Sequence, residues 1–438
     1  MGRRKFSLPR GIRDVEPGEM TKRAWVLDKI VRTMRLYGFQ MVEPATIEYL
    51  ETLEAKSGPD VKDEIYCFVD KAGRSLGLRF DLTVGMTRMV ANRPDLPEPV
   101  KLCAVGGMWR YDEPQYGRYR YFNQWDAEIY GSPSPIADAE IISLGMDILE
   151  GVGLSEFEVR VSNRRLVEAF LSNVGVEGGK IAETLRAIDK LQKISGGGVE
   201  RRLLELGLPP NAVEKIMEFI SLKGEAGRVL GSLPKEALRG EEAAKGREEL
   251  TELFDALSSF GKAGGCILDL SVVRGLDYYD GIVFEAYDRG CEDVGAIFGG
   301  GRFDKLCGIY GKRNLPATGA AGGIERLMLS LERKGLFPRL PPTPEVFVAT
   351  VSKEVEGGAL RLLSLLRRSG LSCDLDLKGK NLRQQLEYAD SVGVPVVVII
   401  GAKELSAGEA VVKDMRRRRE FKVKLSEVPA EIKKVLRG

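Results

Sequence analysis

Polar residues alternate along the segment 109–128, and its pattern predicts a strand, a turn and a returning strand. Pro114 and Gly117 mark the turn. On the returning strand Gln124, Asp126 and Glu128 are spaced two apart, so their side chains lie on one face. Three polar groups make a poor hydrophobic core. The pattern predicts a floor for a polar small molecule, with the arginines of the turn placed to bind anionic oxygens. A solvated hairpin with surface ion pairs is the alternative from this segment alone.

Apolar spacing predicts further elements before this hairpin. They are a helix over 27–34, a strand over 39–42, a hairpin of 65–70 with 75–81, and a helix around 86–90. The hairpin should turn at Ala72 and Gly73, because glycine suits a tight turn.

Changes in pattern divide the rest of the chain. Helical stretches separated by glycines fill 166–258, which predicts a helical insertion and leaves open whether it binds anything. A proline-dense linker follows at 337–344. Beyond it, strands at 346–351, 373–377 and 394–400 alternate with helices at 359–368 and 382–392. This alternation predicts a small α/β domain. We therefore expect four parts, 1–165, 166–258, 259–336 and 343–438.

Length and composition indicate a globular protein of several domains. The chain has 438 residues, of which 43% are hydrophobic and 30% charged. An apolar run of about 18 residues is lacking, so we expect no membrane span and a cytoplasmic location. The six cysteines are scattered without a Cys-x-x-Cys pair. We expect reduced, mostly buried thiols and no zinc site.

The chain contains no histidine, and this limits its chemistry. Serine–histidine triads, histidine general bases and histidine-ligated metals are excluded. Catalysis must rest on carboxylates, arginines, backbone dipoles or the substrates themselves. Residues 343–438 hold 18 Lys and Arg against 13 Asp and Glu, a net +5, which suggests a polyanion partner. The run 416–419 of four arginines is open to two interpretations, a charged β-turn or a contact with RNA phosphate.

Four motifs resemble histidyl-tRNA synthetases, in the archaeal and eukaryotic-like form. Residues 109–128 resemble the second signature of class II aminoacyl-tRNA synthetases, and 320–327 the last one. Residues 273–285, with the sequence Val-Arg-Gly-Leu-Asp-Tyr-Tyr-Asp-Gly-Ile-Val-Phe-Glu, and 299–306 resemble two signatures peculiar to the histidine enzymes. All four stand in the family's order.

The resemblance implies an α+β fold, a class II antiparallel sheet flanked by helices. It also implies a helical insertion that contacts the tRNA acceptor arm, and a C-terminal α/β anticodon-binding domain. The implied activity is formation of histidyl-adenylate from histidine and ATP, followed by transfer to the 3′ end of tRNA(His). Mg²⁺ would be carried by ATP, with no protein side chain as a metal ligand. The first long helix and strand would form a homodimer interface.

The resemblance also assigns roles to individual residues. Arg274 would be the fixed cation at the α-phosphate and, with Arg110, would act in catalysis. The implied ATP contacts are Arg110, Asp112, Arg118, Phe122 and Arg326. The implied histidine contacts are Asp81, Thr83, Gln124, Glu128, Tyr278 and Tyr279. The chain departs from the usual family pattern at three positions: Asp81 and Asp112 stand where glutamate is common, and Phe303 where tyrosine is common.

Three other protein classes compete with this interpretation. A synthetase-like regulatory subunit of the phosphoribosyltransferase that opens histidine biosynthesis would lack the terminal domain and the arginines at 110, 274 and 326. A prolyl-, threonyl- or glycyl-type synthetase would not explain the motifs at 274–279 and 299–304. A non-catalytic RNA-binding protein would have an eroded nucleotide pocket.

Overall fold

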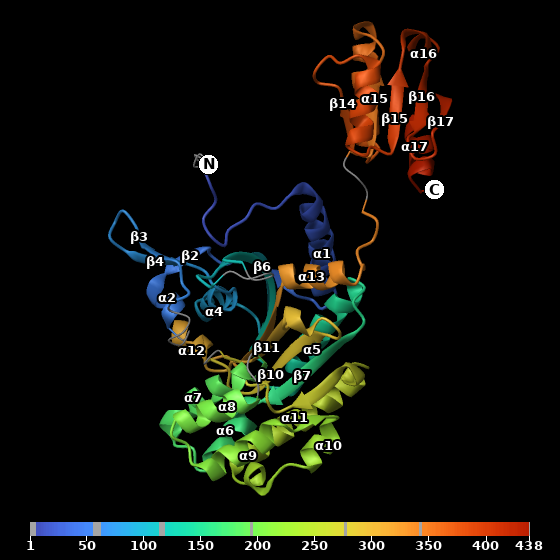
Figure 1. Ribbon diagram of the computed structural model, residues 1–438. Helices are drawn as coiled ribbons and strands as arrows, with labels where there is room; N and C mark the ends of the chain where they lie inside the picture. The colour runs from blue at the N-terminus through green and yellow to red at the C-terminus, as the bar shows by residue number, and fades with distance from the viewer. Residues whose placement is uncertain are drawn as a thin grey trace, which may run out of the picture. The chain divides into compact units, whose positions relative to one another are not determined.

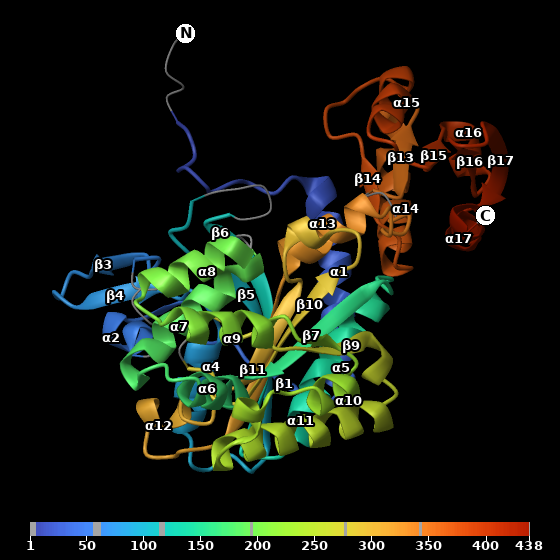
Figure 2. The same cartoon turned by 60° about the horizontal axis from the view of Figure 1, so that its bottom comes forward.

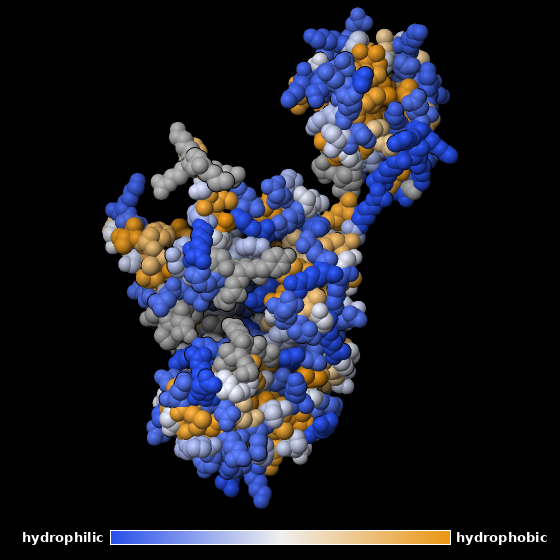
Figure 3. Space-filling model, in the orientation of Figure 1, coloured by the Kyte–Doolittle hydropathy of each residue, from blue (hydrophilic) through white to orange (hydrophobic). Residues whose placement is uncertain are grey.

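The computed structural model describes residues 6–55, 63–113, 119–192, 196–275, 278–340 and 344–437. The chain forms two compact units, Met1–Phe337 and Pro338–Gly438. Hydrophilic residues cover most of the visible surface of each unit (Figure 3). Within the described ranges, no helix is long and apolar enough to cross a membrane.

A nine-stranded sheet is the centre of the first unit, with the order β1-β5-β6-β12-β11-β10-β7-β9-β8 (Figure 1). Neighbours are antiparallel except for the parallel pairs β1–β5 and β7–β9. In sheet order the strands are β1 (Gln40–Met41), β5 (Val100–Trp109), β6 (Tyr121–Tyr130), β12 (Ala317–Gly323), β11 (Phe298–Arg302), β10 (Ile282–Asp288), β7 (Phe157–Asn163), β9 (Cys266–Asp269) and β8 (Lys223–Gly224).

Helices cover one face of this sheet and bury its main core. They are α1 (Pro17–Leu36), α5 (Pro135–Gly151), α11 (Glu241–Ser259) and α13 (Ile324–Arg333). On β6, Trp125, Ala127 and Ile129 pack into the core that these helices share. Because strand side chains alternate, the residues between them face the opposite side. The predicted polar alternation on β6 therefore points away from the helix layer.

A smaller sheet and several helices lie over that opposite face. The sheet has the order β2-β4-β3, with β2 (Ile47–Tyr49), β3 (Cys67–Val69) and β4 (Ser75–Leu78). The short helix α2 (Leu50–Glu54) follows β2, while α4 (Thr83–Ala91) follows β4 and α12 (Cys307–Tyr310) packs against α4. The predicted hairpin is confirmed, and Gly73 at its turn has φ +80°. A second apolar cluster joins Leu82, Met86 and Tyr130 there.

The segment predicted to be a helical insertion is mostly helical. Its members are α6 (Arg164–Asn173), α7 (Gly178–Asp189), α8 (Gly196–Glu205), α9 (Pro210–Ile220), α10 (Ala226–Gly231) and the 3-10 helices η1 (Lys190–Gln192) and η2 (Lys235–Leu238). Helices α7, α8 and α9 cluster together (Figure 2). Phe170 stacks on Phe219 at 3.9 Å between ring centroids. This segment shares its apolar core with the large sheet, so its boundaries stay a prediction.

The 3-10 helices η3 (Ala263–Gly265) and η4 (Glu292–Val294) lie in connections of the first unit. Five of the six cysteines are buried, Cys67 is exposed and all six are free thiols, as expected.

The second unit is a five-stranded α/β domain with the order β14-β13-β15-β16-β17. Its elements are β13 (Val346–Thr350), η5 (Lys353–Val355), α14 (Glu356–Arg368), β14 (Cys373–Leu375), α15 (Leu382–Ser391), β15 (Val396–Ile400), α16 (Ala402–Ser406), β16 (Glu409–Asp414), β17 (Arg419–Lys424) and α17 (Val428–Arg437). The first three of its strands in sheet order are parallel, as the alternation of strands and helices predicts. Arginines 416–418 lie in the turn between β16 and β17, and Arg419 begins β17.

Candidate active site

Glycine and alanine residues of β12 and β11 form a flat surface on the face of the large sheet opposite its helix layer. We call this surface, made of Gly299, Gly301, Gly319 and Ala321, the glycine floor. Residues opposite each other on antiparallel strands point to the same face. Asp126 on β6 lies opposite Ala321, which lies opposite Gly299, which lies opposite Glu285 on β10. The next row leads from Glu128 through Gly319 and Gly301 to Val283. The strands between β6 and β10 therefore present almost no side chains on this face.

The floor has no room for larger residues at two of these positions. A Cβ on Gly319 would lie 2.7 Å from Cγ of Glu128. A Cβ on Gly299 would lie 2.7 Å from Nη1 of Arg274. Both distances are shorter than a nonbonded contact, so glycine is what lets these two long side chains lie down on the sheet.

Arg274 reaches this floor from a loop with unusual backbone geometry. Its φ is +57°, in the left-handed region that non-glycine residues rarely adopt. Nη1 donates to Oε1 of Glu285 at 2.6 Å, and the guanidinium lies 5.7 Å from the ring centroid of Tyr279. Burial alone would lower the pKa of Arg274, but Tyr279 and Glu285 outweigh it and raise that pKa. The guanidinium is therefore a permanent cation.

The position of Arg274 brings it into the same site as the polar side chains of β6. Its Nη1 lies on Gly299, two strands away from Asp126 along one row of the sheet. Two strand spacings amount to about 10 Å.

Three buried carboxyl groups lie at the β6 end of the floor. Asp81 is 7% exposed, and Asp126 and Glu128 are 1% exposed. Burial raises the pKa of Asp81 to about 6 and that of Glu128 to about 8, against an opposing hydrogen bond in each case. Burial and the neighbouring charges of Glu128 and Asp81 raise the pKa of Asp126 well above its usual value. The cluster would be stabilised by a cation.

Unpaired acceptors mark the same end of the site. In the described structure, Oδ2 of Asp81, Oδ1 of Asp126 and Oε1 of Gln124 are buried without a hydrogen-bond partner. The hydroxyl of Thr83 lies 3.5 Å from the other oxygen of Asp126. The hydroxyl of Tyr130 donates to Glu128. Buried acceptors without donors are costly, so these oxygens indicate a ligand that brings N–H groups.

Aromatic rings form one wall next to these carboxyl groups. Tyr278 and Tyr279 are each 7% exposed, with ring centroids 4.7 Å apart. Phe303 is buried between them and Tyr130, at 5.9 Å from Tyr278, 6.5 Å from Tyr279 and 6.2 Å from Tyr130. Phe303 therefore closes the wall with an apolar ring, and Tyr130 and the two other tyrosines supply the hydroxyls.

The residues predicted to bind ATP begin at the open end of β5 and β6. Arg110 follows β5, donates through Nε to the carbonyl of Phe80 at 2.9 Å, and lies 5.2 Å from the ring centroid of Phe122. Phe122 precedes Gln124 by two residues, so it lies on the same face. Asp112 follows, and its carbonyl accepts a 2.9 Å bond from Nε of Arg120. Arg118, Pro114 and Gly117 lie outside the described residues.

Arg326 lies in the first turn of α13, directly after β12. Its Nη1 donates to the carbonyl of Ala296 at 3.0 Å, and a Cβ on Gly323 would lie 3.9 Å from its side chain. Its neighbour Glu325 has a structural place instead. That carboxylate accepts from the backbone and side-chain amides of Asn123 and from Arg23, at 2.9–3.2 Å. Glu325 thus ties the start of β6 to α1 and α13.

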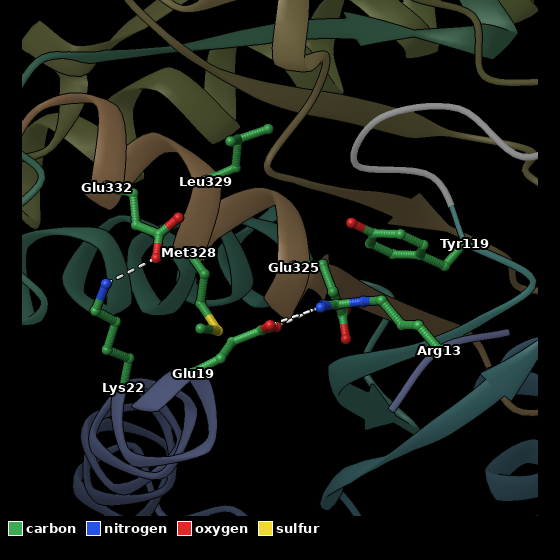
Figure 4. A pocket seen from close by; sticks show the side chains of 8 residues that line it. All are labelled: Arg13, Glu19, Lys22, Tyr119, Glu325, Met328, Leu329 and Glu332. Atoms are coloured by element: carbon green, nitrogen blue, oxygen red, sulfur yellow. Dashed lines mark hydrogen bonds and ion pairs between the residues drawn. The ribbon is translucent and has the colours of Figure 1, made fainter. Parts of the chain in front are cut away.

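A cavity of about 280 Å³ lies elsewhere, on the helix-layer side of the sheet (Figure 4). It is lined by Arg13, Glu19, Lys22, Tyr119, Glu325, Met328, Leu329 and Glu332. None of the residues that we predict to bind substrate lines it. We place the active site at the glycine floor, because that is where the cation and the unpaired acceptors meet.

Three residues that are not among the predicted ligand contacts belong to this site. Asp126 carries the same signal as its predicted neighbours, since it shares their alternation on β6. Tyr130 continues that alternation, and only its contact with Glu128 distinguishes it from an ordinary strand tyrosine. Glu285 has no local signal, because only strand register places it opposite Gly299.

These features define a class of protein, the class II type of synthetase with an antiparallel catalytic sheet. The fold agrees with a crystal structure of histidyl-tRNA synthetase from Nostoc sp. PCC 7120, with TM-score 0.85 and 28% identity over 99% of this chain and 100% of that one. It is also similar to a Bacillus halodurans structure titled ATP phosphoribosyltransferase regulatory subunit/histidyl-tRNA synthetase, with TM-score 0.77 and 25% identity over 92% of this chain and 100% of that one.

The sequence comparisons identify the family. The histidyl-tRNA synthetase model matches residues 11–327, and the anticodon binding domain model matches residues 345–435. Curated relatives named histidine–tRNA ligase include one from Pyrococcus furiosus, 37% identical over 98% of this chain and 99% of its own length. Another, from Aeropyrum pernix, is 38% identical over 98% of both chains. The chain belongs to the histidyl-tRNA synthetase family, so the predicted family and fold class are confirmed.

Proposed function

We propose that this chain is an enzyme that joins histidine to ATP, releases diphosphate, and transfers the histidyl group from the adenylate to the 3′ end of tRNA(His). One observation carries the proposal. Arg274 and the acceptor-rich strand β6 share one face of the sheet and are separated by a floor of glycine and alanine. A nucleotide and an amino acid can meet over such a floor, with a cation on one side and carboxylates on the other.

In this proposal the carboxyl cluster binds histidine. The α-ammonium group brings three N–H donors and a positive charge, which the unpaired oxygens of Asp81, Asp126 and Gln124 require. Thr83 contributes its hydroxyl. Glu128 and the hydroxyls of Tyr278 and Tyr279 would bind the two imidazole nitrogens, which lie at different edges of the ring. Amino acids without both nitrogens would leave buried polar groups unpaired and would be rejected.

In this proposal the arginines bind the nucleotide. Arg110 and Arg326 would bind the triphosphate, Asp112 and Arg118 would belong to the loop over it, and Phe122 would stack on the adenine ring. Arg274 would lie at the α-phosphate, where attack by the histidine carboxylate adds negative charge at the phosphorus oxygens. A fixed guanidinium stabilises that charge in the transition state. Mg²⁺ would accompany ATP through its outer phosphates.

Transfer to tRNA needs an acceptor for the proton of the terminal ribose hydroxyl. The chain has no histidine side chain for this step. We infer that a non-bridging phosphate oxygen of the adenylate takes the proton. A protein carboxylate whose removal abolished only the transfer step in single-turnover kinetics would contradict this assignment.

The remaining parts of the chain take the family's other roles in our proposal. The basic second unit would bind the anticodon, and the helices of the segment 166–258 would contact the acceptor arm. Two copies would pair through α1 and β1 to form a homodimer in the cytoplasm. Arginines 416–418 lie at a turn, which fixes their local structure and leaves an RNA contact as a proposal.

A non-catalytic regulatory subunit is the second candidate, because one similar solved structure carries that title together with the synthetase name. This chain retains the arginines at 110, 274 and 326. It also retains a complete second unit that matches the anticodon binding domain model over 345–435. Both features favour the enzyme.

The test is ATP–pyrophosphate exchange with each of the twenty amino acids, using wild type, Arg274→Ala and the control Arg289→Ala. Arg289 is an exposed arginine at the end of β10. We expect exchange with histidine alone, its loss in Arg274→Ala and its retention in Arg289→Ala. Exchange with another amino acid, or no exchange in the wild type, would refute the proposed function.

A further inference from the structure

Glu285 is held by contacts to both of its carboxylate oxygens. Oε1 accepts from Nη1 of Arg274 at 2.6 Å, and Oε2 accepts from the hydroxyl of Tyr287. Tyr287 follows two residues later on the same strand, so its side chain shares the same face. The guanidinium of Arg160, on the neighbouring strand β7, lies 4.5 Å from the ring centroid of Tyr287. Glu285 is thus fixed within a packed row of side chains.

The strand that carries Glu285 is held rigidly by pairing along both of its edges. β10 is an interior strand, paired with β11 on one side and β7 on the other. Arg274, by contrast, lies on a loop, and its long side chain has several rotatable bonds. A side chain of this kind loses much rotational freedom when it is fixed. An ion pair to a rigid strand can fix it before the substrate arrives.

The geometry fixes one edge of the guanidinium and leaves others for a ligand. Nη1 is used by Glu285 and rests on the glycine floor at Gly299. A guanidinium has five N–H donors in a rigid plane, so one edge can bind a carboxylate while another binds an oxyanion. The Tyr279 ring lies beside the same guanidinium. The plane of the arginine is therefore set from two sides.

We propose that Glu285, held by Tyr287, is the positioning residue that aims the Arg274 guanidinium at the reacting phosphate. The inference rests on the proposed function, since it assigns Arg274 the phosphate. Glu285 itself does not contact the substrates. Its effect should therefore fall on the chemical step, with little change in histidine binding.

The experiment measures kcat and KM for ATP–pyrophosphate exchange in Glu285→Gln, Tyr287→Phe and the double variant Arg274→Ala/Glu285→Gln. Asp147→Asn is the matched control. Asp147 is also a carboxylate that accepts from a tyrosine hydroxyl, Tyr37 at 2.6 Å, and pairs with a cation, Lys262 at 2.5 Å. It lies on α5, in the helix layer on the other face of the sheet.

In Glu285→Gln we expect kcat to fall about 100-fold, the size of loss that misplacing a catalytic group produces. The KM for histidine should change by less than about 2-fold. Tyr287→Phe keeps the ring and loses one hydrogen bond, so a loss on the order of 10-fold is expected. Asp147→Asn should keep the wild-type kcat. The double variant should be no slower than Arg274→Ala alone, because a positioning residue has nothing to position once the arginine is gone.

Wild-type kcat in both Glu285→Gln and Tyr287→Phe would overturn the inference. A double variant that lost the full Glu285 factor on top of the Arg274 loss would also overturn it, since Glu285 would then act by another route. These results leave the proposed function intact as long as Arg274→Ala is strongly impaired and keeps only a measurable residual rate, against which the double variant is compared. If Arg274→Ala exchanges normally, the assigned role of Arg274 fails and the inference fails with it.

Discussion

Replacing Glu128 with glutamine should stabilise the free protein. Glu128 is 1% exposed, and its burial raises its pKa from 4.5 to about 8. Glutamine keeps the size of the side chain and an oxygen that can accept from Tyr130, but it carries no charge. The change therefore isolates the cost of holding an ionisable carboxyl group in the site.

The sign and size follow from the two pKa values. The folded chain binds the Glu128 proton more tightly than the unfolded chain, so wild-type stability is retained below pH 4.5 and falls as the pH rises toward 8. Each pH unit in this window costs about 1.4 kcal/mol, which gives about 3 kcal/mol at pH 7. Relative to wild type, the variant should therefore gain nothing at pH 4 and about 3 kcal/mol at pH 7.

Scanning calorimetry between pH 4 and 8 measures this difference. The transition of the first unit should shift upward at pH 7 by on the order of 2 °C per kcal/mol, and the second unit serves as an internal reference. Glu332→Gln is the control, because Glu332 pairs with Lys22 near the surface, with 43% of its side chain exposed. A wild-type-to-variant difference that did not change with pH would refute the reasoning. So would wild type becoming relatively more stable toward pH 8.

Three further predictions concern packing and tRNA binding. Arg302→Ala should destabilise the first unit by about 3–5 kcal/mol in urea unfolding, because Asp138 would lose its buried ion-pair partner, the two side chains being 3% and 0% exposed. Gly300→Ala should cost about 1–3 kcal/mol in the same assay, since its Cβ would lie 1.9 Å from the carbonyl oxygen of Gly319; an unchanged midpoint would contradict the packing. The double variant Arg416→Ala/Arg418→Ala should have a higher KM for tRNA, and that KM should depend less on salt concentration, while ATP–pyrophosphate exchange stays at the wild-type rate. If the variant and the wild type have equal kinetics with tRNA, these arginines have only a structural place in the turn.

The spacing of hydrophobic and polar residues predicts much of the fold, because it depends on which side of each helix or strand packs into the core. The alternation on β6 follows from one face packing against α5 and α13 while the other faces a polar site. The strands and helices of the second unit follow from the same rule, to within a few residues at their ends. The boundaries of the segment 166–258 are harder to predict, because α11 packs on α5 and β8 joins the large sheet. The spacing of residues within one segment does not show that the segment shares a hydrophobic core with a distant part of the chain.

Residue type and order along the chain were enough to predict the family, the polar face of β6, the reduced cysteines and the exclusion of histidine chemistry, since each is a property of the sequence itself. Strand register decided the rest. It placed Glu285 opposite Gly299 and brought Arg274 within two strands of Asp126, although Arg274 and Asp126 are far apart along the chain. Burial decided which carboxyl groups have raised pKa values, because a pKa depends on the removal of water and on neighbouring charges, and only the folded chain creates those surroundings.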